Sequence, residues 1–200
     1  MSTDSEAIAA SITDPDRFSE IFERHAPAVA GYVRRRIGAE GVDDVLSETF
    51  LVAFRRRASF ETSSDSARPW LFGIATRLMR RHRAQEAARW RVFEHASGAA
   101  ETAGRDDHAS DERLDASRAI RELAPRIAAL SRKDRDTLLL YAWGDMTYEQ
   151  VAASLGVPVG TVRSRLNRVR AKLAPPGSGG KARLTWMAKE GNDGRIGSRA

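Results

Sequence analysis

Residues 147–173 read TYEQVAASLGVPVGTVRSRLNRVRAKL, a pattern that predicts two helices joined by a tight turn. Thr147 and Gln150 have the spacing of a capping box, in which the threonine hydroxyl and the glutamine side chain satisfy the first free amides of a helix. Gly156 supplies a left-handed stop, and Val157-Pro158 form the turn that leads into the second helix. A short helix, a brief turn and a longer helix are typical of a helix-turn-helix.

The second helix of this motif has an apolar side and a basic side. Its apolar side chains recur at helical spacing and form the expected buried stripe of Val162, Leu166, Val169 and Leu173. Residues 158–172 include five basic side chains and no acid, so the other side offers donors for guanine or phosphate and an amide for adenine. We expect duplex DNA to contact a basic face that consists of Arg163, Ser164, Asn167, Arg168 and Arg170. A merely solvated basic face is the alternative.

A second candidate surface lies on the helix expected over residues 42–57. The expected core side of this helix consists of Leu46, Phe50, Ala53 and Phe54. Its other side presents what we term the acidic-leucine face, made of Asp44, Ser47, Glu48, Leu51 and Arg55. This face would suit a basic partner helix, with Leu51 as the apolar anchor. The alternative is again simple solvation.

Arginines gather on the helix that opens at Pro69 and is expected over residues 67–90. We term them the arginine cluster, which consists of Arg77, Arg80, Arg81, Arg83 and Arg89. Arginine interleaved with aromatic side chains is what the binding of unstacked single-stranded bases requires, because every base offers a π-face and a phosphate. For Trp70 and Phe72 themselves we expect a place in the core.

Composition limits the classes of protein to which the chain can belong. Its 200 residues allow one ordinary domain or two small ones, at about 100–200 residues per domain. The absence of cysteine excludes disulfides, thiolate zinc sites and thiol nucleophiles. No apolar run approaches the ~18 residues of a membrane span. We therefore expect a soluble, cytoplasmic protein with no membrane span.

The net charge of +6 is distributed unevenly along the chain. The segments 1–54, 55–91, 92–120, 121–173 and 174–200 have net charges of −5, +7, −4, +5 and +3. Of the 33 basic residues 29 are arginine, so the placement of an arginine indicates a site and its mere presence does not. The basic excess favours a nucleic acid or an anionic surface as partner.

Strand patterns are nearly absent and helical spacing is present throughout, which predicts an all-α fold. The expected helices lie near residues 16–36, 42–57, 67–90, 119–129, 132–143, 147–155 and 159–173. An acidic stretch with few large apolar residues predicts a flexible linker, and Pro175-Pro176 ends the last helix. The expected parts are a disordered N-terminal extension (1–15), a helical domain (16–94), the flexible acidic linker (95–118), a helix-turn-helix domain (119–174) and a tail (175–200).

Four motifs occur in a fixed order along the chain: DDVLSETF at 43–50, RPWLFGIA at 68–75, YEQVA at 148–152 after Leu130, and GTVRSRL at 160–166. In this order they resemble the extracytoplasmic-function sigma factors of bacterial RNA polymerase, the smallest two-domain members of the sigma-70 family. The likeness covers about residues 16–94, which resemble the sigma-2 domain, and 119–174, which resemble the sigma-4 domain.

The resemblance implies a subunit that gives core RNA polymerase its promoter specificity. The acidic-leucine face would bind the clamp of the largest polymerase subunit, and the sigma-4 domain would meet the flap of the second-largest. The arginine cluster would hold the melted minus-10 element, and the basic face would read the minus-35 duplex of promoter DNA. An anti-sigma factor is the expected controlling partner.

Two positions depart from the family pattern. Ser47 stands where glutamine is usual, which removes one amide from the expected clamp contact. Arg77 stands where asparagine is common, so the base preference at that position is open.

Patterns that would support catalysis, a metal site or a cofactor are missing from the sequence. The four histidines are scattered without paired-ligand spacing, and no pair of nucleophile and base can be named. We therefore expect no enzyme, no catalytic residue, no metal and no cofactor. A stand-alone helix-turn-helix regulator and a nucleic-acid enzyme are the alternatives; the first leaves the acidic-leucine face and the arginine cluster unexplained, and the second lacks catalytic residues.

Overall fold

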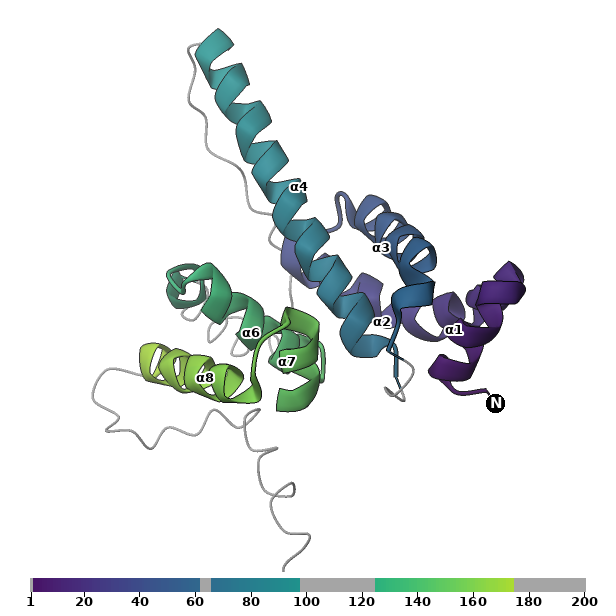
Figure 1. Cartoon of the computed structure of the whole chain (residues 1–200). Helices are drawn as coiled ribbons and strands as arrows, with labels where there is room; N and C mark the ends of the chain where they lie inside the picture. Colours follow the sequence, from purple (N-terminus) through teal and green to yellow (C-terminus); the bar gives the residue numbers. More distant parts are fainter. Residues whose placement is uncertain (1, 62–65, 98–124, 175–200) are drawn as a thin grey trace, which may run out of the picture.

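The computed structural model describes residues 2–61, 66–97 and 125–174, and the side chains of these ranges apart from 83–97. Within them every regular element is a helix, which confirms the all-α prediction. In chain order (Figure 1) the elements are α1 (Asp4–Thr13), η1 (Pro15–Phe18), α2 (Ser19–Ile37), α3 (Val42–Arg56), η2 (Arg57–Ser59), α4 (Arg68–Ser97), α6 (Arg132–Trp143), α7 (Tyr148–Leu155) and α8 (Val159–Leu173).

Helix α1 corrects the expectation of a disordered N-terminal extension. Its first turn is closed by a capping box, in which Thr3 Oγ1 accepts from the Glu6 amide and Glu6 accepts from the Thr3 amide. Ala7 and Ile8 are buried against the rest of the protein. Asp4 and Glu6 therefore lie in the first turn of a helix.

The buried carboxylate of Asp4 connects α1 to α2 and to the residue that precedes α4. Asp4 accepts from His25 Nε2 at 2.6 Å, from the Ala67 amide at 2.8 Å and from Arg24 Nη1 at 3.0 Å. Burial tends to raise the pKa of Asp4, but the hydrogen bond from the Ala67 amide and the interactions with His25 and Arg24 outweigh it and lower that pKa. Asp4 therefore remains a carboxylate at neutral pH.

Helices α2, α3 and α4 form the first packed group. An aromatic pair joins α2 to α3, with the Phe22 and Phe50 ring centroids 4.8 Å apart in an edge-to-face arrangement. At the start of α3, Gly41 adopts φ +77°, a left-handed conformation that favours glycine. Helix α4 runs on through Ser97, so residues 95–97, which were expected in the linker, are helical; the linker's remaining residues, 98–118, lie outside the described ranges.

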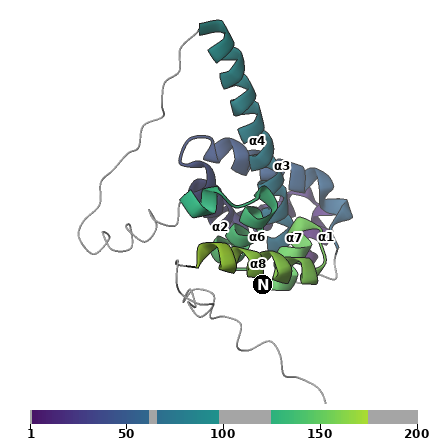
Figure 2. The same cartoon turned by 90° about the vertical axis from the view of Figure 1, so that its left-hand side faces the viewer.

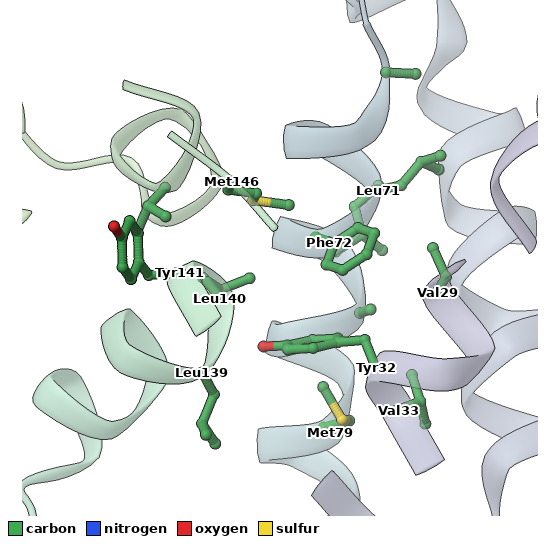
Figure 3. Packing of buried hydrophobic residues seen from close by; sticks show 14 of the residues in the cluster. Val29, Tyr32, Val33, Leu71, Phe72, Met79, Leu139, Leu140, Tyr141 and Met146 are labelled. Atoms are coloured by element: carbon green, nitrogen blue, oxygen red, sulfur yellow. The ribbon is translucent and has the colours of Figure 1, made fainter. Parts of the chain in front are cut away.

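Helices α6, α7 and α8 form the second group, which packs directly against the first (Figures 1 and 2). The buried residues of both groups belong to one hydrophobic cluster. Figure 3 shows Tyr32, Phe72 and Met79 on the α2 and α4 side, facing Leu140 and Met146 of the second group. The two helical groups, termed the two halves below, correspond to the two predicted helical domains and pack against each other through one continuous core. The predicted helix over 119–129 is described only from residue 125 onward, and the tail lies outside the described ranges.

Candidate nucleic-acid and protein interfaces

The helix-turn-helix has the local chemistry that its sequence predicts. Thr147 Oγ1 accepts from the Gln150 amide at 3.3 Å, and the Thr147 amide donates to Gln150 Oε1 at 3.0 Å. Helix α7 ends at Gly156, whose φ of +64° is the left-handed stop. Helix α8 then begins after Pro158. The capping box and the turn are both confirmed.

Helix α8 turns its basic face outward. The predicted stripe of Val162, Leu166, Val169 and Leu173 is buried. Four members of the basic face are exposed: Arg163, Ser164, Asn167 and Arg168. The fifth, Arg170, is half-buried and donates to Tyr148 Oη and Asn167 Oδ1, each at 3.1 Å. The exposed side chains are therefore within reach of a duplex, and their contact with DNA stays a prediction.

A buried acid behind α8 orients one arginine of the basic face. Arg168 Nη2 lies 3.1 Å from Asp134 Oδ1, and Arg168 Nη1 donates to Ser164 Oγ at 3.2 Å. Burial acts to raise the pKa of Asp134, but hydrogen bonds with Ser131 and Arg168 outweigh it and lower that pKa. Asp134 is therefore ionised and directs the guanidinium of Arg168. Sequence patterns alone did not single out Asp134.

The acidic-leucine face is exposed along its whole length on α3. Leu51 keeps 46% of its surface in solvent, and all four polar members of the face are exposed. The core side differs in part from expectation: Phe50 and Ala53 are buried, but Leu46 and Phe54 are only half-buried. The reason is a rotation of the helix, since Val42, Val45 and Thr49 carry the contact with the interior instead.

The arginine cluster is divided among different environments. Arg77 and Arg81 are exposed. Desolvation is the main cause that lowers the pKa of Arg77 from its usual value, and the nearby positive charges of Arg56 and Arg80 add to it. Arg81 Nη1 lies 3.9 Å from Glu48 at the edge of the acidic-leucine face. Arg80 lies against the second helical group, and the side chains of Arg83 and Arg89 lie outside the described set.

The two aromatic residues at the start of α4 belong to the interior. Phe72 is fully buried and packs on Tyr32 with 5.0 Å between ring centroids. Trp70 is half-buried and packs on Phe60 at 5.1 Å. The prediction that both belong to the core is confirmed for Phe72 and holds in part for Trp70. The fold therefore defines an all-α protein in which a helix-turn-helix packs against a second helical half.

Comparison with known families covers both halves. The family described as Sigma-70 region 2 matches residues 21–89, and the family described as Sigma-70, region 4 matches residues 117–173. RNA polymerase sigma factor HrpL of Pseudomonas syringae pv. syringae is 32% identical over 148 residues, which span 71% of this chain and 77% of the relative. ECF RNA polymerase sigma factor EcfG of Rhodopseudomonas palustris is 31% identical, with coverage of 68% and 71%.

Two solved structures share the fold. One is CnrH in complex with the cytosolic domain of CnrY, with a TM-score of 0.59, 26% identity, and coverage of 85% of this chain and 94% of that chain. The other is the sigma factor RpoE in complex with the anti-sigma factor NepR from Bartonella quintana, with a TM-score of 0.53, 23% identity, and coverage of 78% and 93%.

The chain therefore belongs to the sigma-70 family of RNA polymerase sigma factors, in its extracytoplasmic-function branch. Members of this family are DNA-binding transcription initiation factors and not enzymes. A stand-alone regulator is not favoured, because the half that such a regulator leaves unexplained is the one that matches region 2. No helix within the described ranges is long and apolar enough to cross a membrane.

Proposed function

We propose that this sigma factor binds core RNA polymerase through the acidic-leucine face of α3. The observation that carries the proposal is Leu51, a large apolar side chain that remains 46% exposed between Glu48 and Arg55 on an otherwise polar surface. Such a side chain suits the centre of a docking site, where burial of one apolar anchor supplies much of the binding energy. Asp44 and Glu48 add complementarity to a basic helix of the polymerase clamp.

The two promoter elements are assigned to opposite halves of the chain. We assign the melted minus-10 strand to the arginine cluster on the region-2 half, 16–94, where Arg77 and Arg81 are open to solvent. The minus-35 duplex is assigned to the basic face of α8 in the region-4 half, 119–174, which also meets the polymerase flap. Both roles consist of binding, so no catalytic step, metal or cofactor is assigned to this chain.

The proposed regulation is by an anti-sigma factor. Its support is the fold shared with a sigma factor solved in complex with one. Since the proposed partner is core polymerase, the proposed location is the cytoplasm.

In vitro transcription with purified core polymerase and genomic promoters tests the proposal. Specific initiation is expected only when the protein is added, and Leu51→Ala is expected to weaken core binding about tenfold or more, as for a hot-spot residue. Ile12→Ala is the matched control, because Ile12 on α1 is similarly exposed, at 52%, and outside the proposed face. Equal core affinity of Leu51→Ala and the wild type would remove the clamp assignment.

A further inference from the structure

One acidic side chain joins the two helical groups. Asp136 of α6 is 1% exposed and lies between an arginine of α2 and an arginine of α4. Arg36 Nη2 donates to Asp136 Oδ1, and Arg80 Nε donates to Asp136 Oδ2 at 2.8 Å. Arg80 Nη2 lies 2.6 Å from that same oxygen. Both oxygens of this carboxylate are therefore bound by the other half of the chain.

The side chain of Arg36 is positioned by a hydrogen bond to Tyr32. Its Nη1 donates to Tyr32 Oη at 2.8 Å, and the Tyr32 hydroxyl lies 3.0 Å from Thr76 Oγ1 on α4. Burial raises the pKa of Tyr32, so this hydroxyl stays neutral and accepts the hydrogen bond from Arg36. The chain of contacts from Thr76 to Asp136 fixes the guanidinium that meets the second group.

A separate contact lies at the other end of the interface. Arg68, at the start of α4, donates from Nε and Nη2 to the carbonyl oxygen of Gly144 at 3.1 and 2.9 Å. Gly144 ends α6, where the helix dipole favours a positive charge. The guanidinium of Arg68 also lies over the Phe72 ring, 5.1 Å from its centroid.

Close backbone packing of α4 on α7 lies between these polar contacts. A Cβ atom at Gly73 would come within 2.5 Å of the carbonyl oxygen of Ser154, so the two helices touch at this point because residue 73 has no side chain. Phe72 and Met146 pack beside the crossing (Figure 3). The interface is thus closed by apolar packing at its centre and by arginines towards both ends.

The ion pair between Asp136 and Arg80 involves a residue for which we have proposed a role in binding DNA. Arg80 belongs to the arginine cluster, yet its guanidinium is directed at Asp136. A phosphate approaching Arg80 in this arrangement would meet a buried carboxylate of the same sign. Because that carboxylate has lost its water, it depends on its two arginines for compensation. Asp136 occupies Nε and Nη2 of Arg80, so this side of the guanidinium is not open to a bidentate contact with a DNA phosphate while the halves are closed.

We propose that the contact of Asp136 with Arg36 and Arg80 is an internal latch, which holds the halves closed and competes with single-stranded DNA for Arg80. Opening of the halves frees Arg80, and binding of a strand to Arg80 favours opening, because such coupling is reciprocal. The competition with DNA rests on the proposed minus-10 role of the arginine cluster, whereas the closure of the halves does not.

The contact between the two halves is measured on the full chain, without DNA or polymerase. Because the sequence has no cysteine, Ala9→Cys on α1 and Ala171→Cys on α8 introduce one pair of spin labels at exposed positions of the two halves. Pulsed electron paramagnetic resonance is expected to give one narrow distance distribution for the otherwise wild-type chain. Asp136→Asn is expected to shift it to longer, broader distances. An unchanged distribution in Asp136→Asn would overturn the latch.

Two further variants serve as a charge control and as a second test of the contact. Glu149→Gln removes the same charge from an exposed position of α7 in the same half and is expected to leave the distances unchanged. Arg80→Gln removes the α4 partner of Asp136 and is also expected to lengthen the distances. It carries the test if Asp136→Asn does not fold, and an unchanged distribution there would also overturn the latch.

The competition is measured with a fluorescent oligothymidine strand. Asp136→Asn is expected to bind it about tenfold more tightly than the wild type, within the usual range of coupling between two sites, and Glu149→Gln is expected to show no such gain. Longer distances without tighter binding would overturn the competition for Arg80. Failure of promoter-specific transcription with both effects intact would remove the proposed function and leave the latch standing.

Discussion

Helices α4 and α7 cross at Gly73. Addition of one methyl group there, in Gly73→Ala, therefore tests how the two halves pack. In Gly73→Ala the new Cβ would lie 2.5 Å from the backbone oxygen of Ser154, with the Ser154 carbonyl carbon and Cα both at 3.3 Å. All three neighbours are backbone atoms, so no side chain can rotate away. The helices must move apart, as in other overpacked sites.

The magnitude follows from two opposing effects. Alanine inside a helix is more stable than glycine by about 0.5–1 kcal/mol, whereas overpacking costs about 1–3 kcal/mol. The expected net loss in the free energy of unfolding is about 1 kcal/mol, which lowers Tm by about 2–4 °C in a protein of this size. Gly31→Ala is the matched control, because Gly31 lies inside α2 with no atom within 4 Å of its built Cβ. Gly31→Ala therefore keeps only the helix gain and is expected to raise Tm.

Thermal and urea unfolding, followed by circular dichroism, measure both variants against the wild type. Opposite shifts of Tm are expected from two identical chemical changes in two helices. If Gly73→Ala raised Tm as much as Gly31→Ala does, α4 and α7 would not be in contact in solution. The continuous core described above would then be refuted as well.

Two further predictions concern the helix ends. Thr147→Ala removes the hydroxyl that accepts from the Gln150 amide and is expected to cost about 1 kcal/mol; urea unfolding measures the loss, and an unchanged free energy of unfolding would show that the cap contributes nothing. Asp4 has a lowered pKa in the folded chain, so its contribution to stability is present above the unfolded pKa of about 3.9 and is lost as the pH falls through the folded value. The Tm difference between the wild type and Asp4→Asn is therefore expected to shrink in acid, and a difference that is constant with pH would contradict this.

Local patterns in the sequence predicted most of the helices and the helix-turn-helix. The capping box at Thr147, the stop at Gly156 and the buried stripe of α8 depend on neighbours within a few residues, so they can be derived from spacing alone. Helix α1 was missed for a different reason. Its only large apolar residues are Ile8 and Ile12, and its stability comes from burial of Ile8 and from Asp4, whose partners His25 and Ala67 are distant in sequence.

The contacts between the halves could not be predicted from spacing. Asp136 and Arg36 are separated by 100 residues, and in a chain with 29 arginines no pattern distinguishes the one that pairs with a given acid. The acidic-leucine face was predicted correctly as an exposed surface. Its core side was predicted only in part. The buried set of α3 also has helical spacing, so periodicity allows either side, and packing against α2 and α4 selects one of them.

The single uninterrupted helix α4 also has a mechanical consequence. Its first half is fixed to the second group by Arg68, Gly73 and Arg80, whereas its last turns project beyond the body of the protein (Figure 1). Residues 80–97 extend about 25 Å at 1.5 Å per residue, so a tilt of about 10° at the fixed end would sweep the tip through about 4 Å. Helix α4 therefore acts as a lever arm. A small change of angle at its base moves its tip sideways by about 4 Å, a distance close to the rise of one helical turn.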